Sequence, residues 1–329
     1  MSTHRVEVVR LGSIEKHPNA DTLGLVAIWG YTAMVRLGDF KEGDLAAYIE
    51  PDYVVPDTPQ FAFLAGHLRI KAKRLRGIYS QGLLVKAPDG AEEGDDVMEC
   101  MGIVCYEPEV KAMRESGQAA GADNENPPES LAWLSKYDLE NWRRYNDLIV
   151  AGEPVSISEK LHGACGVFAW RDGRIWCGSR NGWKKRDETN LWWKALAQSP
   201  WIEDWCKARA DAILFGEVFG QVQTLKYGAQ LGQIMFRAFD VLLDEPGIDG
   251  RRGRWANVKE FHDMVLEQDR VPVLYEGPFD CECVETLSIG NSVLADHLSE
   301  GVVIRPMVER VAHIGRVVLK LVGNEYMLR

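Results

Sequence analysis

The sequence predicts an α+β protein in which a small N-terminal β-barrel precedes a larger domain of strands and helices. Residues 1–105 contain short alternating segments, such as 6–11 and 32–37, which glycines separate at close spacing, as in small barrels. From about residue 131 onward, apolar segments with helical spacing are mixed with strand-like ones. A chain of 329 residues is long enough for two such domains, each with its own core.

A change in composition separates the two predicted domains. Residues 106–131 contain six acidic and two basic residues, and Gly117, Gly121, Pro127 and Pro128 interrupt them. We therefore expect an acidic linker at 106–131, between a barrel domain at 1–105 and a second domain at 132–329. In the second domain, the apolar spacing predicts helices over 131–148, 191–210 and 258–269. Strands are expected at 155–158, 166–169, 212–215, 235–243 and 301–305.

Composition places the chain among ordinary globular proteins of the cytoplasm. No apolar run approaches the length of about 18 residues that a membrane span needs, and the N-terminus has no signal-peptide pattern. The seven cysteines form no Cys-x-x-Cys pair, which favours a reducing compartment. We therefore expect a cytoplasmic protein without a membrane partner.

Basic residues gather in one part of the predicted barrel, although the net charge of −11 argues against nucleic-acid binding through the overall field. Residues 58–88 contain no acidic side chain. Such a local stripe can follow a phosphate backbone, and it can equally be the solvated face of a strand. The candidate nucleic-acid-binding residues are Arg69, Lys71, Lys73, Arg74 and Arg76.

The most informative string is Glu159-Lys160-Leu161-His162-Gly163, which comes directly after the strand-like segment 154–158. A lysine at the end of a strand can be a nucleophile if its site lowers the pKa of the amine, by desolvation or by nearby positive charge. Gly163 would let the backbone come close to a phosphate. Taken alone, the string also fits an ordinary surface lysine, so the interpretation depends on the motifs downstream of Lys160.

Five further strings lie downstream of Lys160, and most of them set a charged residue at the end or start of a strand-like segment. They are Ser179-Arg180-Asn181, Leu214-Phe215-Gly216-Glu217, Phe236-Arg237-Ala238-Phe239-Asp240, Glu300-Gly301-Val302-Val303-Ile304-Arg305 and Val317-Val318-Leu319-Lys320. In this order, the strings resemble the nucleotidyltransferase motifs of the polynucleotide ligase and mRNA-capping superfamily, over about residues 136–329. The form Glu-Lys-x-His-Gly resembles RNA ligases more than DNA ligases or capping enzymes.

The N-terminal region carries a second resemblance. Its His17-Pro18-Asn19-Ala20-Asp21 turn, its Gly43-Asp44 string and its Ser80-Gln81-Gly82-Leu83-Leu84 string are similar to the OB-fold domain fused in front of one RNA ligase family. That family seals 3′-OH/5′-phosphate nicks. Together the resemblances imply an N-terminal OB-like β-barrel followed by an adenylyltransferase (ATP-grasp-like ligase) domain of antiparallel sheets and helices.

The resemblance also implies roles for individual residues. Lys160 would attack the α-phosphate of ATP to give a lysyl-AMP, and Lys320 would neutralise that phosphate. Phe239 would stack on the adenine, and Arg180 would contact phosphate. Glu217 and Glu300 would bind the ribose or a divalent metal, Mg²⁺ or Mn²⁺. The remaining expected nucleotide-binding residues are Glu159, His162, Gly163 and Arg305.

Two departures from the ligase pattern concern residues close to the implied site. Val322 stands where a second basic residue usually comes after the final lysine, so either Arg305 or Arg316 substitutes for it, or the register at Lys320 is shifted. Ala164 and Cys165 stand where related ligases favour threonine and asparagine.

Three alternatives compete with an ATP-dependent RNA ligase. A DNA ligase or a GTP-using capping enzyme would be expected to carry an OB domain after the last motif, and here nine residues remain after Lys320. A non-catalytic RNA-binding protein would be expected to have lost some of Lys160, Glu217, Glu300 and Lys320. The expected partners are ATP and a nicked RNA or RNA-containing duplex, bound by a monomer.

Overall fold

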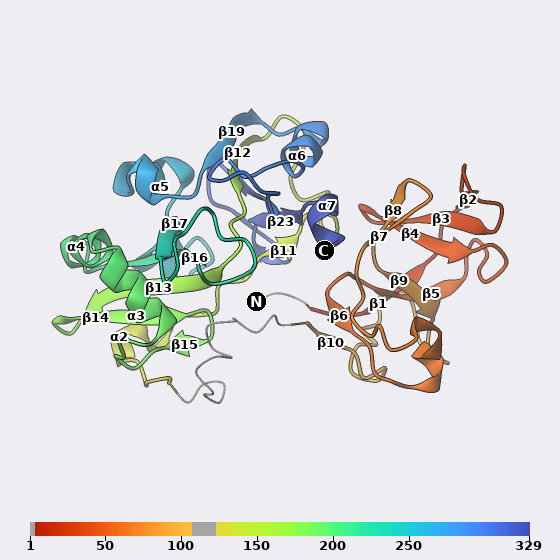
Figure 1. Ribbon diagram of the computed structural model, residues 1–329, viewed down its shortest axis with the longest axis horizontal. Coiled ribbons are helices and arrows are strands. Elements are labelled where there is room, and N and C mark those ends of the chain that lie inside the picture. Colours follow the sequence, from red (N-terminus) through yellow and green to blue (C-terminus); the bar gives the residue numbers. More distant parts are fainter. Residues whose placement is uncertain (1–3, 107–122) are drawn as a thin grey trace. The chain divides into compact units, whose positions relative to one another are not determined.

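The computed structural model describes residues 4–106 and 123–329, which form two compact units (Figure 1). The barrel unit consists of residues 4–106, 140–147 and 324–329, and the large unit of residues 123–139 and 148–323. Segments 140–147 and 324–329 thus belong with the barrel, although both lie in the predicted second domain. Within the predicted linker, residues 107–122 lie outside the described residues.

The barrel unit is built from short antiparallel strands that form two three-stranded sheets and two two-stranded pairs, of which β7-β8 is a hairpin. The sheet orders are β1-β5-β9 and β2-β3-β4, and the pairs are β6-β10 and β7-β8. The elements are β1 (Glu7–Arg10), β2 (Ile14–Lys16), β3 (Leu23–Ile28), β4 (Tyr31–Arg36), β5 (Leu45–Ile49), β6 (Tyr53–Val54), η1 (Pro59–Leu64), β7 (Lys73–Leu75), β8 (Ile78–Ser80), β9 (Leu83–Lys86), β10 (Val104–Cys105), β11 (Glu140–Asn141) and α7 (Asn324–Met327).

The His17-Pro18-Asn19 turn holds the tip of the β7-β8 hairpin in place. The backbone N–H of Asn19 donates to Nδ1 of the buried His17 at 2.9 Å, so the Nε2–H of that ring donates to the Leu75 carbonyl at 3.2 Å. The Asn19 amide donates to the Arg76 carbonyl at 3.1 Å. Arg76 and Gly77 both have positive φ, as the two-residue turn between twisted strands requires.

The large unit contains two antiparallel sheets. One sheet includes the order β23-β20-β12-β19, and the other has the order β15-β14-β13-β16-β17-β18. The strands are β12 (Pro154–Glu159), β13 (Ala164–Arg171), β14 (Arg174–Ser179), β15 (Gly182–Trp183), β16 (Ala212–Gly220), β17 (Ile234–Pro246), β18 (Arg252–Trp255), β19 (Val273–Pro278), β20 (Gly301–Pro306) and β23 (Leu319–Val322), with the short pair β21 (Val311–Ala312) and β22 (Gly315–Arg316).

The helices of the large unit are short: α2 (Glu129–Ala132), α3 (Leu191–Gln198), α4 (Trp201–Ala208), α5 (Val258–Met264), η2 (Glu267–Asp269) and α6 (Cys281–Leu287). Apolar side chains of α3 and α4, such as Trp192 and Ile202, share one buried cluster with Phe168 of β13 and Leu214 of β16. The six-stranded sheet therefore has a core covered by helices on one face. No helix in the described ranges is long and apolar enough to cross a membrane.

The structure corrects three of the expected helices. The helix predicted over 131–148 is wrong, because α2 ends at Ala132 and residues 133–139 have no helical turn. The helix predicted over 191–210 is two helices, since Ser199 and Pro200 lie between α3 and α4, and a proline removes a helical hydrogen bond. The segment 258–269 divides into α5 and η2. All five expected strands are present, within longer ones.

Candidate active site

Lys160 lies directly after β12, where that strand leaves the sheet. Its backbone N–H donates to the Gly301 carbonyl of β20 at 2.9 Å, and its ammonium forms an ion pair with Glu300, the residue before β20. Both side chains are largely buried, with side-chain exposures of 24% and 11%. The lysine is therefore held close to a carboxylate in a site with little water.

The strand register places Lys320 on the same face of the sheet as Lys160. Ser158 pairs with Val303, which pairs in turn with Lys320, and paired residues of an antiparallel sheet share a face. Lys160 comes two residues after Ser158, so its side chain leaves the same face. Val322 pairs with Gly301 and also shares this face. Val322, where related ligases usually have a second basic residue, therefore lies on the same face of the sheet as Lys160 and Lys320.

Two carboxylates near Lys160 have opposite pKa shifts. Burial raises the pKa of Glu217 on β16 to about 8, opposed by the positive charge of Lys160 and reinforced by the negative charge of Glu300. Burial also acts to raise the pKa of Glu300, but Lys160 and His162 outweigh it, and the pKa lies below its ordinary value. Glu300 is thus the charged partner of the lysine, and Glu217 retains its proton near neutral pH.

Gly163 is required by packing within the large unit. A Cβ at this position would collide with the backbone carbonyl of Val218 on β16. The segment that joins β12 to β13 therefore passes against β16 with no room for a side chain. This is a structural reason for the glycine, and the expected approach to a phosphate stays a prediction.

Glu159 points away from Lys160, because consecutive residues of a strand alternate between faces. Its side chain is buried, and one carboxylate oxygen accepts the Val293 backbone N–H at 3.1 Å. Burial raises the pKa of Glu159, and hydrogen bonds from Ser292 and Val293 oppose this shift. Glu159 therefore fixes the loop that precedes Glu300.

Phe239 lies in an aromatic cluster at the middle of β17. The centroid of its half-buried ring is 4.9 Å from that of Tyr137, which also contacts Phe215 and Trp255, each at 5.4 Å between centroids. Tyr137 in turn donates its hydroxyl proton to Asp240 at 3.0 Å. The predicted adenine-stacking ring is thus supported from the side by a tyrosine of the segment before β12.

Asp240 is the centre of a buried charge network that includes Arg305. Its side chain is 1% exposed and pairs with Arg316 at 2.5 Å and with Arg305 at 3.3 Å. Glu309 contacts the same two guanidinium groups at 2.7 and 2.8 Å. Arg305 and Arg316 were the candidates to replace the basic residue missing at Val322. The charges of both are compensated by carboxylates of the large unit. The nucleotide-binding role expected for Arg305 stays a prediction.

Arg180 lies just after β14, and one of its guanidinium nitrogens is 3.9 Å from an Asp138 oxygen. Cys165 pairs with Glu217 across β13 and β16, and burial, together with the smaller effect of the Glu217 negative charge, raises the pKa of its thiol. The thiol is therefore neutral at physiological pH. Cys165, one of the residues that depart from the ligase pattern, thus lies beside the candidate carboxylate Glu217.

The carboxylates of Glu217 and Glu300 could supply part of the coordination of a divalent metal. Within the described part of the chain, one buried oxygen of Glu300 has only the His162 ring near it, at 3.4 Å from Nδ1, and Glu217 and Glu300 are close enough to perturb each other's pKa. A cation between them would favour loss of the Glu217 proton and would offset the repulsion between the two carboxylates. In residues 4–106 and 123–329, no group of three or more His, Cys, Asp or Glu side chains could hold a metal by itself. Substrate phosphates would have to complete the coordination, as is common for Mg²⁺.

The five basic candidates of the barrel unit fall into two groups, according to their position and the partners of their side chains. Arg69 pairs with Asp52 at 2.6 Å and stacks on Tyr106, and Lys71 donates to the Arg329 carbonyl at 3.2 Å. Lys73, Arg74 and Arg76 lie on the β7-β8 hairpin, are exposed, and have no carboxylate partner among the described residues. We call these three residues the basic hairpin.

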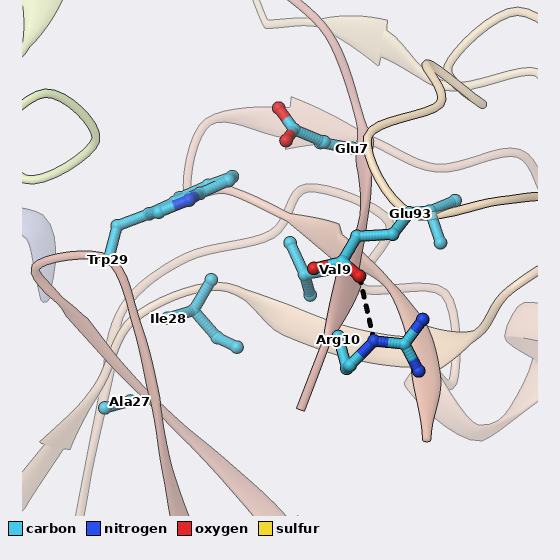
Figure 2. Close-up of a pocket in the computed structure, with 8 residues that line it drawn as sticks. Glu7, Val9, Arg10, Ala27, Ile28, Trp29 and Glu93 are labelled. Carbon is cyan, nitrogen blue, oxygen red and sulfur yellow. Dashed lines mark hydrogen bonds and ion pairs between the residues drawn. The ribbon is translucent and has the colours of Figure 1, made fainter. Parts of the chain in front are cut away.

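The barrel unit also has a shallow pocket between β1 and the end of β3 (Figure 2). Its two carboxylates are already compensated: Glu7 pairs with Arg144 at 2.7 Å, and Glu93 pairs with Arg10 at 2.8 Å. None of the predicted site residues lines this pocket. We therefore place the candidate active site at Lys160 and not at this pocket.

Several residues that hydrogen-bond to the Lys160 segment, or support those that do, lie outside the sequence motifs and were not predicted. These are Thr224 and Tyr227, on the loop after β16, and Val293 and His297, on the loop before β20. They belong to irregular segments with no periodic pattern. Two further residues lie beside Phe239. Asp240 belongs to one of the motifs, but nothing in the sequence assigned it a role, and Tyr137 lies in the segment that was wrongly predicted to be a helix.

Two family models match different parts of the chain. A family model described as RNA ligase matches residues 153–322, just over half of the chain, and an OB-fold domain model matches residues 5–87. No curated protein that was compared matches the chain. The second match confirms the expected OB-like N-terminal barrel.

Solved structures extend the likeness to almost the whole chain. A lysine-to-alanine variant of the Naegleria gruberi RNA ligase, with ATP and Mn, is 22% identical with a TM-score of 0.80, over 99% of this chain and 98% of that one. The same ligase with PPi is 23% identical with a TM-score of 0.78, over 98% and 97% of the two chains. At this identity, the likeness confirms the predicted fold class.

Proposed function

The chain belongs to the RNA ligase family, which confirms the predicted class of enzyme, and we propose that it uses ATP to join RNA 3′-OH and 5′-phosphate ends. The observation that carries the ATP-dependent mechanism is the buried Lys160–Glu300 pair, which lies where β12 ends and β20 begins, with Lys320 on the same face of the sheet. Its burial favours the neutral amine that a lysine nucleophile requires, whereas the Glu300 carboxylate positions the amine and balances its charge before the proton is lost.

In the first step, the neutral Lys160 amine attacks the α-phosphorus of ATP. A nitrogen–phosphorus bond forms, the bond to the bridging oxygen breaks, and pyrophosphate leaves with that bond's electron pair. The amine proton leaves towards Glu300 or solvent, because the carboxylate already contacts this group. The N. gruberi ligase structures with ATP and Mn and with PPi support this proposal, because they hold a substrate and a product of such a step.

Two further steps complete the proposed reaction. An oxygen of the RNA 5′-phosphate attacks the AMP phosphorus, which releases Lys160 and leaves an adenylylated 5′ end. The 3′-OH oxygen then attacks the 5′-phosphorus and AMP departs. Phosphoryl transfers of this kind depend mainly on positioning and on neutralisation of charge.

The remaining site residues would bind the nucleotide, hold the metal or support the lysine. Phe239 stacks on the adenine from its half-buried cluster, and Arg180 and Lys320 neutralise phosphate oxygens. Glu217 and Glu300 would hold Mg²⁺ or Mn²⁺, which would supply charge neutralisation of the phosphates when bound. Glu159, His162 and Gly163 shape the segment around Lys160, and Arg305 braces the β17–β20 region through Asp240.

The barrel unit is proposed to bind the RNA, a nicked strand or an RNA-containing duplex, through its phosphates. The basic hairpin supports this role, since its three cations are exposed and lack carboxylate partners among the described residues. We also propose that the domains divide the work at about residues 105 and 132, and that the enzyme acts as a monomer in the cytoplasm. Its seven cysteines, all free thiols in the structure, support a reducing compartment.

Incubation with α-labelled ATP and Mg²⁺ or Mn²⁺ tests the proposal. The wild-type protein is expected to gain covalent label, and a nicked RNA duplex is expected to remove it. Lys160→Ala should abolish labelling but still seal a pre-adenylylated nick to some degree, because the activated phosphate no longer needs the lysine. Lys259→Ala is a matched control, since Lys259 is an exposed lysine of α5 that pairs with Asp263 on the same helix.

Three outcomes would contradict the proposal. Full labelling of Lys160→Ala would overturn the choice of nucleophile. Label from α-labelled GTP in place of ATP would indicate a capping-type enzyme. Binding of the nicked duplex without any covalent label would indicate an RNA-binding protein without the first step.

A further inference from the structure

The segment that carries Lys160 is held at both ends by hydrogen bonds. Upstream, the Lys160 backbone N–H donates to the Gly301 carbonyl at 2.9 Å. Downstream, the His162 backbone N–H donates to the hydroxyl oxygen of Tyr227 at 2.7 Å. The first bond continues the sheet, whereas the second comes from a side chain 65 residues further along the chain.

The same loop also holds the His162 ring. Thr224 Oγ1 is 3.2 Å from Nε2 of His162, and a Glu300 oxygen is 3.4 Å from Nδ1 on the other side. The ring is thus held between the loop after β16 and the carboxylate that pairs with Lys160. A displacement of this loop would therefore be transmitted to both His162 and Glu300.

Tyr227 is itself fixed in one orientation. Its side chain is 6% exposed and packs edge-on against Phe219 and His297, at centroid distances of 5.1 and 4.6 Å. Its backbone N–H donates to Nε2 of His297 at 3.3 Å, and the other ring nitrogen of His297 lies 3.0 Å from the Leu298 carbonyl. The tyrosine has a φ of 51°, a conformation that costs a bulky residue free energy and persists only where its surroundings impose it.

We propose that Tyr227 is a positioning residue for the lysine nucleophile, an inference that rests on the proposed ligase function. Its hydroxyl oxygen fixes the amide two residues after Lys160, and with the Gly301 bond it restricts the backbone from which the lysine side chain extends. A fixed backbone keeps the amine aligned with the α-phosphorus, and small misalignments of a nucleophile cost large factors in rate. The His297 ring supports the tyrosine through the hydrogen bond to its backbone and the edge-on ring contact.

The test is Tyr227→Phe, which removes one oxygen and keeps the ring packing. At saturating ATP, the rate of AMP transfer to Lys160 should fall at least tenfold, with the KM for ATP within threefold of the wild type. Sealing of a pre-adenylylated nick should also remain within threefold, because that step does not use the lysine as a nucleophile. His297→Leu, which removes the supporting ring, should give the same selective loss with a smaller factor.

Tyr275→Phe is the matched control. The Tyr275 hydroxyl donates to the Pro278 carbonyl at 2.9 Å within β19 and not to the Lys160 segment, so both steps should keep their wild-type rates. Wild-type AMP transfer in Tyr227→Phe would overturn the inference. So would an equal loss in both steps, which would indicate a general structural defect, or a loss confined to KM. If the wild-type protein itself gained no label from ATP, the proposed function would fail and this inference with it.

Discussion

The barrel unit and the large unit use charge in opposite ways. On the basic hairpin, three cations lie close together in sequence, point to solvent and have no carboxylate partner among the described residues. Around Lys160 and Phe239, the charges come from distant parts of the chain, are largely buried and are compensated by opposite charges. The first arrangement suits a long polyanion, and the second suits one accurately placed phosphate.

The difference has an energetic basis. An exposed cation costs little to maintain and attracts phosphates by releasing counterions, so its contribution depends on salt. A buried charge is destabilising unless it is paired, so every member of a buried network becomes important for folding. Substitutions in the two units should therefore differ in whether stability or nucleic-acid binding changes.

The largest effect is expected at Asp240, the centre of the buried network. Asp240→Asn removes the negative charge that Arg305 and Arg316 share and weakens the bond from Tyr137. Leaving buried guanidinium groups only partly compensated should lower the free energy of unfolding by about 3 kcal/mol. Denaturant unfolding of the purified protein measures this change.

Asp263→Asn serves as the control for that measurement. Asp263 pairs with Lys259 on the surface of α5, where both side chains are mostly exposed. We expect its free energy of unfolding to stay within about 0.5 kcal/mol of the wild type. A loss as small as this in Asp240→Asn would mean that the network is not a major source of stability.

An intermediate effect, on binding rather than on stability, is expected at the basic hairpin. Replacing Lys73, Arg74 and Arg76 together with glutamine should leave unfolding and AMP transfer nearly unchanged. Sealing of a nicked duplex at sub-saturating RNA should fall by about tenfold, and the salt dependence of binding should become shallower by up to about 3 logarithmic units per decade of salt. A salt series of duplex-binding measurements would detect this.

A second barrel variant with the same change in charge is the control for the hairpin. It replaces three exposed basic residues of other barrel elements, Lys16, Arg36 and Lys41, with glutamine. We expect sealing to change by less than about threefold, because overall charge alone contributes weakly. Equal losses in the two variants would show that the hairpin is an ordinary solvated surface.

The strands of the large unit were easier to predict from the sequence than its irregular segments. The five strands expected in the large unit and the order of the charged motifs were predictable, because each of these apolar runs has a charged residue at or near one end. Other strands, such as β15, β18 and β19, were not predicted. The helix expected over 131–148 was wrong because Trp133 and Tyr137 are partly buried by packing in an irregular segment, beside Arg252 and Phe239. Periodic burial does not require a helix when aromatic side chains are long enough to reach the core.

The supporting residues of the site were not predictable from the sequence. Tyr227 and His297 lie in loops, 67 and 137 residues after Lys160, and their spacing carries no signal. Only the folded backbone shows that both loops converge on the β12–β13 connection. Even Gly163, which the sequence did single out, has a structural cause in the Val218 carbonyl that no motif reveals.

The smallest expected effect concerns Glu217 and is a dependence of stability on pH. The pKa of Glu217 is raised to about 8 in the folded protein, whereas an unfolded glutamate titrates near about 4.3. Between these values the folded protein holds a proton that the unfolded chain releases, so stability falls as pH rises through this window. Glu300 differs, because its pKa is lowered, and its contribution is lost only as pH falls below the ordinary range of a glutamate.

Glu217→Gln removes this titration and should therefore flatten the pH profile of the metal-free protein. Relative to the wild type, the variant should gain stability progressively from about pH 5 to about pH 8. The full gap between the two pKa values would correspond to about 5 kcal/mol. We expect a gain of about 1 kcal/mol at the upper end, because part of the Glu217 side chain reaches solvent and can be hydrated when it ionises. Thermal unfolding measured across that range, with the exposed Glu188→Gln as control, gives the comparison. Parallel profiles for Glu217→Gln and the wild type would show that Glu217 is ionised throughout, and that the two carboxylates beside Lys160 share the site as charged neighbours.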